Sequence, residues 1–77
     1  MKSIKFNPQK LFDVLDCIDN INDKSNGKQI DLIVPLTANS RWIAIFFDKL
    51  RYTKYELEGV SDINNGEDTL ISLKKKM

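Results

Sequence analysis

Histidine is absent from this chain of 77 residues, and cysteine occurs only once, as Cys17. The absence of histidine removes the commonest general base and the commonest transition-metal ligand of proteins. A single cysteine cannot form an internal disulfide, and cysteine with carboxylates alone makes a poor zinc site. The three glycines are scattered, so there is no glycine-rich phosphate loop. The sequence therefore predicts a protein that is not an enzyme, with no catalytic residue, no cofactor and no metal site.

A strong excess of one charge and a long apolar run are also missing. The 12 basic residues nearly balance the 11 acidic ones, for a formal net charge of +1. That balance gives no general attraction to nucleic acid or to a membrane. No apolar stretch has the length of a transmembrane helix, and the first residues do not resemble a signal peptide. Because a lone cysteine is also typical of a reducing compartment, we expect a cytoplasmic protein with one small domain over residues 1–77.

One amphipathic helix is evident in the first third of the chain. The pair Asn7-Pro8 favours a helix start, because asparagine caps helices and proline is tolerated in their first turn. The predicted helix ends near Asn22, where turn-forming residues follow. Its apolar positions recur at helical spacing, namely Leu11, Val14, Leu15, Ile18 and Ile21. We expect Leu15 and Ile18 in the core, and a short strand over residues 2–6 before the helix.

The segment from residue 30 to residue 47 predicts two strands. In residues 30–36 the apolar Ile30, Leu32, Val34 and Leu36 alternate with Asp31, Ile33 and Pro35, which predicts a strand with one strongly apolar face. Pro35 favours an edge position or a bulge. Residues 37–40 then predict a hairpin loop that leads into a second strand over residues 41–47.

The C-terminal third predicts further strands. A strand over residues 50–58 would need a bulge near Thr53-Lys54, and a helix over residues 46–58 is the competing interpretation. Asn64-Asn65-Gly66 is a turn signal that precedes a short strand at residues 70–73. The sequence thus predicts an α+β fold, with one N-terminal amphipathic helix packed on an antiparallel β-meander of three to four strands.

The predicted strand over residues 41–47 suggests a partner. As a strand it would place apolar side chains on both faces, while a single helix can cover only one of them. A domain this small also gains stability from association. We therefore expect the uncovered face to contact another protein chain, either a second copy in a homodimer or a host protein. The predicted interface residues are Trp42, Phe46, Tyr52 and Tyr55.

Composition adds an indication of origin. Lysine greatly outnumbers arginine, and asparagine and isoleucine are plentiful, which is typical of AT-rich genes in low-GC bacteria and their phages. The predicted function is that of a phage or mobile-element accessory protein, which binds a host protein and modulates or inhibits it. A structural subunit of a larger assembly is an alternative.

A second alternative is nucleic-acid binding. Arg41, Arg51 and Lys54 could contact phosphates beside the strand aromatics. Glu56 and Glu58 follow directly and would repel a phosphate backbone, so nucleic acid is not the expected partner. The lysines at positions 74–76 predict a charged, solvated tail.

Overall fold

Two helices and four strands form the described parts of the chain, residues 2–24 and 27–77 of a computed structural model. The elements, in chain order, are β1 (Lys2–Lys5), α1 (Leu11–Asp19), a π-helical turn η1 (Asn20–Lys24), β2 (Gln29–Pro35), α2 (Ser40–Leu50), β3 (Tyr55–Ile63), a 3-10 turn η2 (Asn64–Gly66) and β4 (Asp68–Lys75).

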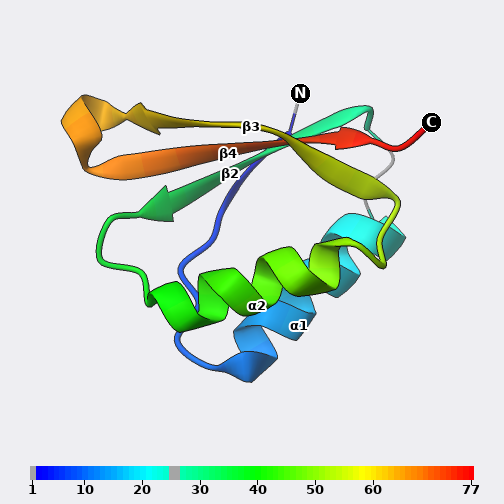
Figure 1. Ribbon diagram of the computed structural model, residues 1–77, viewed down its shortest axis with the longest axis horizontal. Coiled ribbons are helices and arrows are strands. Elements are labelled where there is room, and N and C mark those ends of the chain that lie inside the picture. The colour runs from blue at the N-terminus through cyan, green and yellow to red at the C-terminus, as the bar shows by residue number, and fades with distance from the viewer. Residues whose placement is uncertain (1, 25–26) are drawn as a thin grey trace.

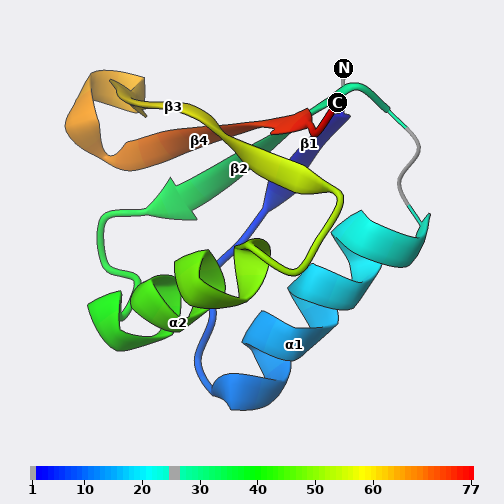
Figure 2. The ribbon, with the colours of Figure 1, turned by 45° about the vertical axis from the view of Figure 1, so that its right-hand side comes forward.

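The four strands form one mixed sheet in the order β1-β2-β4-β3. β1 and β2 run parallel, whereas β4 runs antiparallel to both of its neighbours, β2 and β3. Both helices pack on one face of this sheet, as Figures 1 and 2 show. The α+β class is confirmed, but the single helix and the antiparallel meander were wrong. The parallel pair requires a crossover connection, and α1 supplies it.

The core lies between the sheet and the two helices. In β2 the alternate residues Ile30, Leu32 and Val34 are buried, as the sequence pattern predicted. β2 is nevertheless a central strand. Pro35 is its last residue and lies past the end of the β1 ladder, where the Phe6 N–H donates to the carbonyl of Ile33 (2.9 Å). The missing N–H of Pro35 therefore interrupts no pairing with β1.

The helix α1 starts later than the sequence predicted, and a different set of its side chains faces the core. Asn7 does not cap it, because Lys10 holds the N-cap position and the first helical residue is Leu11, while Pro8 is buried ahead of the helix. Val14 and Cys17 face the core, together with Ile21 from η1. Ile18 is only partly buried, and the side chain of Leu15 is 40% exposed. The predicted core position of Leu15 was thus wrong.

Residues 41–47 are helical. They belong to α2, which Asn39 caps by accepting a hydrogen bond from the Arg41 N–H on its side-chain oxygen (2.9 Å). At helical spacing Phe46 and Leu50 are buried in the core. The strand with two apolar faces was therefore wrong, and so was the hairpin loop at residues 37–40. The competing helix over residues 46–58 was wrong as well, because the chain is already extended at Tyr55.

β3 and β4 form a hairpin around the predicted turn. Asn64, Asn65 and Gly66 all have positive φ values, of 54°, 59° and 84°, which asparagine and glycine tolerate best. The register shifts at a bulge between Leu57 and Gly59. The bulge predicted near Thr53-Lys54 is not there, since both residues precede β3.

Candidate functional site

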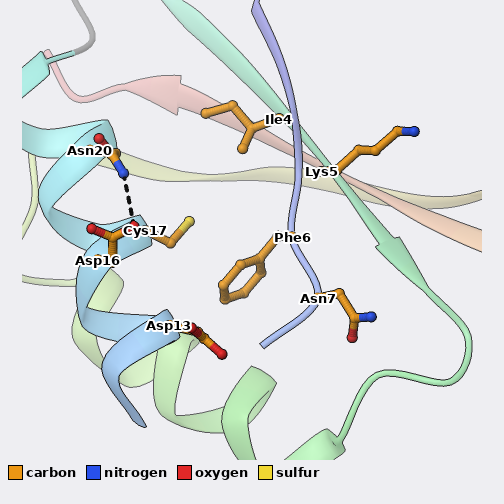
Figure 3. A pocket seen from close by; sticks show the side chains of 8 residues that line it. All are labelled: Ile4, Lys5, Phe6, Asn7, Asp13, Asp16, Cys17 and Asn20. Atoms are coloured by element: carbon orange, nitrogen blue, oxygen red, sulfur yellow. Dashed lines mark hydrogen bonds between the residues drawn. The ribbon is translucent and has the colours of Figure 1, made fainter. Parts of the chain in front are cut away.

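A polar hollow of about 440 Å³ lies between β1 and α1. Figure 3 shows that Ile4 and Phe6 point toward α1, whereas Lys5 and Asn7 point away from it. The remaining lining residues come from the helical segment and are Asp13, Asp16, Cys17 and Asn20. This hollow brings the thiol of Cys17 near the carboxylates of Asp13 and Asp16.

The chemistry of the hollow is limited by how these groups are held. Burial, and secondarily the charge of Asp16, raise the pKa of the Cys17 thiol to about 12. Cys17 is therefore a thiol at physiological pH, and the thiolate is the reactive form. Asp13 accepts a hydrogen bond from the Gln9 N–H (2.8 Å), and Asp16 accepts one from the Asn20 side-chain amide (3.3 Å). These carboxylates hold local structure together.

We expect Cys17 to resist alkylation while the protein is folded. At pH 8 a pKa of about 12 lowers the thiolate fraction roughly a thousandfold relative to an ordinary cysteine. Mass spectrometry after treatment with iodoacetamide should show rapid labelling in urea and little labelling in buffer. Equal labelling rates under both conditions would show that the thiol is accessible and ionisable in the folded state.

No set of three or more Cys, Asp or Glu side chains in residues 2–24 and 27–77 is placed to hold a metal ion. Within the same residues, neither helix combines the length and apolar character needed to span a membrane.

A second hollow, of about 410 Å³, lies between α2 and the β3–β4 hairpin. Ile43, Ala44 and Phe47 line it from α2, and Val60 lines it from β3. Leu36, in the loop after β2, stands at its rim with 74% of its side chain exposed, and Val60 is 56% exposed. We call this feature the apolar seam.

The apolar seam continues along α2. Phe47 also lines an adjoining hollow of about 310 Å³, together with Leu57 and Tyr55 of β3. Leu57 is partly exposed there, and β3 is an edge strand of the sheet. The seam therefore combines exposed aliphatic side chains with the open edge of a strand.

The strand β3 is acidic. It carries Glu56, Glu58 and Asp62 and no basic residue. Glu56 lies 3.8 Å from the Lys74 ammonium, and Glu58 accepts hydrogen bonds from the Gln29 side chain (3.0 and 3.2 Å). Asp62 is exposed and, among the described residues, forms no ion pair.

Basic residues gather at the open end of the hairpin, where the end of β4 pairs with the start of β3. The Lys76 N–H donates to the Lys54 carbonyl (2.8 Å), and the Lys76 ammonium donates to the Arg51 carbonyl (2.8 Å). The Lys75 N–H donates to the Lys28 carbonyl (2.8 Å). The lysines predicted as a solvated tail are exposed, but Lys74 and Lys75 belong to β4, and Lys76 continues it through its hydrogen bonds to Lys54 and Arg51.

The structure separates the predicted interface residues. Phe46 and Tyr55 are fully buried, so their side chains are absent from the surface. Trp42 is partly buried on α2, and only Tyr52, in the turn after α2, is well exposed. Of the predicted phosphate contacts, Arg51 and Lys54 lie together near the end of α2, and Arg41 lies at the start of that helix.

Sequence reasoning missed the residues of the apolar seam. Leu57 and Val60 are isolated aliphatic residues in an otherwise polar strand, which was the available signal. A further exposed apolar patch also went unnoticed, because Leu11 was placed on the apolar face of the helix and Leu15 in the core. Phe12, which is 65% exposed, completes that patch, with the Lys10 ammonium 5.7 Å from its ring centroid.

Compared with protein-family models, with curated proteins and with solved structures, the chain matches none of them.

Proposed function

We propose that this protein binds another protein chain through the apolar seam and acts by that binding, modulating the activity of its partner without catalysis of its own. The observation that supports the proposal is the hollow beside α2, rimmed by the exposed side chains of Leu36 and Val60. Exposed aliphatic side chains around a concave surface are typical of interaction sites.

Burial of the seam would supply useful binding energy. Covering one aliphatic side chain fully contributes about 1.5–3 kcal/mol. Leu36, Leu57 and Val60 are already partly covered, so each would contribute less than that. Their sum still suits the apolar centre of an interface, with charged residues at its rim. The acidic side of β3 provides such a rim.

A blocking substitution tests the proposal. Ala44 is exposed on α2 and lines the seam, so Ala44→Arg should fill the hollow while keeping a residue that favours helices. Gln9→Arg adds the same charge at an exposed position before α1 and serves as the matched control. Affinity capture from a nuclease-treated lysate of the source organism should recover the same partner with wild type and Gln9→Arg, and lose it with Ala44→Arg.

Undiminished capture by Ala44→Arg would contradict a role for the seam. Capture that disappears for every variant after nuclease treatment would favour the second candidate function.

That second candidate is nucleic-acid binding at the basic end of the hairpin. The hydrogen bonds of Lys75 and Lys76 support it. They go to the backbone carbonyls of Lys28, Arg51 and Lys54, so these basic residues lie near the end of β4. An ion pair works against it, since Asp48 lies 3.4 Å from the Arg51 guanidinium. Binding to short DNA or RNA should then weaken in Arg51→Ala with Lys54→Ala, and its salt dependence should fall by about one unit per lost phosphate contact.

A further inference from the structure

We propose, resting on the function above, that the partner contributes an extended segment with alternating apolar and basic side chains, which adds to the outer edge of β3 as a fifth strand. Three observations support this mode of binding: the direction of the β3 backbone, the apolar seam beside it and the charge of β3.

The hydrogen bonds of β4 establish which backbone groups face which neighbour. The Lys76 N–H donates to Lys54, just before β3, and the Lys75 N–H donates to Lys28, just before β2. Successive residues of an antiparallel strand turn their backbone groups to opposite sides. Even-numbered residues of β4 thus face β3, and odd-numbered residues face β2.

The register then identifies the open groups of β3. Gly59 and Ser61 pair with even-numbered residues of β4 and are satisfied by them. Leu57 and Val60 pair with odd-numbered residues, as does Asp62, so their N–H and C=O groups point away from the sheet. No strand of the described residues pairs with this outer edge. An added strand would satisfy these groups, whereas a docked helix would leave them unpaired.

The side chains of an added strand would meet two different surroundings. On the helix side it would lie beside Leu57 and Val60, with Ala44 and Phe47 of α2 behind them. On the open side it would lie beside Glu56 and Glu58, whose partners Lys74 and Gln29 belong to that face. Because strand side chains alternate between faces, the fitting segment alternates apolar with basic residues.

A second copy of this chain fits the edge poorly. Pairing β3 with another β3 would bring Glu56, Glu58 and Asp62 near the same carboxylates of the partner, and β3 carries no basic residue to offset them. Edge charges and bulges are common protections against such self-pairing. The charge therefore favours a basic partner of different sequence.

Synthetic peptides test the proposal directly. The probe is a capped nine-residue peptide of alternating lysine and valine, and the first control replaces every lysine by glutamate. We expect the lysine peptide to bind with NMR shifts at Leu57, Val60 and Asp62, and the glutamate peptide to bind at least about tenfold more weakly. Two further versions carry N-methyl groups on either all valine or all lysine nitrogens. One of them should lose binding and the other retain it, since only one set of amides faces β3.

Two variants of the protein test the backbone hydrogen bond between β3 and the peptide. Val60→Pro removes an outward N–H without touching the β4 ladder, and Val60→Ala keeps that N–H while shortening the side chain. We expect Val60→Pro to bind the lysine peptide at least about fivefold more weakly than Val60→Ala does. Equal binding by these two variants, or by the two N-methylated peptides, would overturn strand addition.

Affinity capture distinguishes a failure of strand addition from a failure of the proposed function. If the captured partner is lost with Ala44→Arg but kept with Val60→Pro, the seam binds a protein by side-chain contacts alone. In that case the proposed function stands and strand addition is wrong.

Discussion

Replacing Phe46 with alanine is expected to lower the free energy of unfolding by about 3–5 kcal/mol, the usual cost of deleting a fully buried phenylalanine. The ring of Phe46 packs against Phe6 and Phe47, with centroid distances of 5.0 and 5.8 Å. A domain of 77 residues has roughly 4–12 kcal/mol of stability by the per-residue average, so the loss is a large share of the total. Urea unfolding followed by circular dichroism measures it.

Phe12→Ala is the matched control for this experiment. It deletes the same ring from a position that is mostly exposed, and we expect it to cost less than about 1 kcal/mol. The comparison also separates a core residue from an interface residue. A Phe46→Ala variant with wild-type stability but impaired partner binding would return Phe46 to the surface, where the strand interpretation had placed it.

Replacing Ala44 with proline should cost about 3 kcal/mol or more, because proline within a helix removes a hydrogen bond and clashes with the preceding turn. Ala44 lies inside α2, beyond its first turn. Its side chain is small and exposed, so the loss would come from the backbone rather than from packing. Thermal melting followed by circular dichroism should show a large drop in the unfolding temperature.

Val60→Pro is the matched control, because it places proline in an edge strand instead of a helix. There the N–H points out of an edge strand, and we expect a cost of about 1 kcal/mol or less. If Ala44→Pro melts like the wild type, residues 40–50 are not a helix in solution.

Local sequence patterns predicted those elements whose period is unambiguous. Ile30, Leu32 and Val34 recur at the period of a strand, and the Asn64-Asn65-Gly66 turn uses residues that accept positive φ. The body of α1 was also evident from its spacing, although its orientation was not. Leu15 and Cys17 are both compatible with an apolar face, and only packing against α2 and the sheet decides between them.

The prediction for residues 41–47 was wrong because their apolar positions fit both the period of a strand and the period of a helix. Trp42, Ile43 and Ile45 through Phe47 are nearly continuous, so a strand with two covered faces and a helix with a broad apolar face explain them equally well. The aromatic and β-branched residues then favoured a strand. Asn39 was the overlooked signal, since it caps α2 where a hairpin loop was predicted.

The shape of the apolar seam could not be predicted from local patterns, although Leu57 and Val60 in β3 were a signal for two of its residues. Its walls come from α2 and the β3–β4 hairpin, and they face each other only because β4 lies between β2 and β3. That strand order depends on pairings between residues far apart in the chain. The exposure of Leu36 and Val60 follows from the same arrangement and has no counterpart in their immediate neighbours.

The position of β4 has a consequence for how the protein is made. Synthesis proceeds from the N-terminus, yet β4, the last strand in the chain order, lies in the interior of the sheet. In residues 2–24 and 27–77, β3 has no other strand neighbour. In a nascent chain that has reached Ile63, β4 is still missing, so β3 has no strand to pair with. The sheet is completed only when Asp68–Lys75 inserts between β2 and β3, so folding must follow the synthesis of that segment. Until then we expect the negative charges of Glu56, Glu58 and Asp62 to disfavour pairing between β3 strands of different chains.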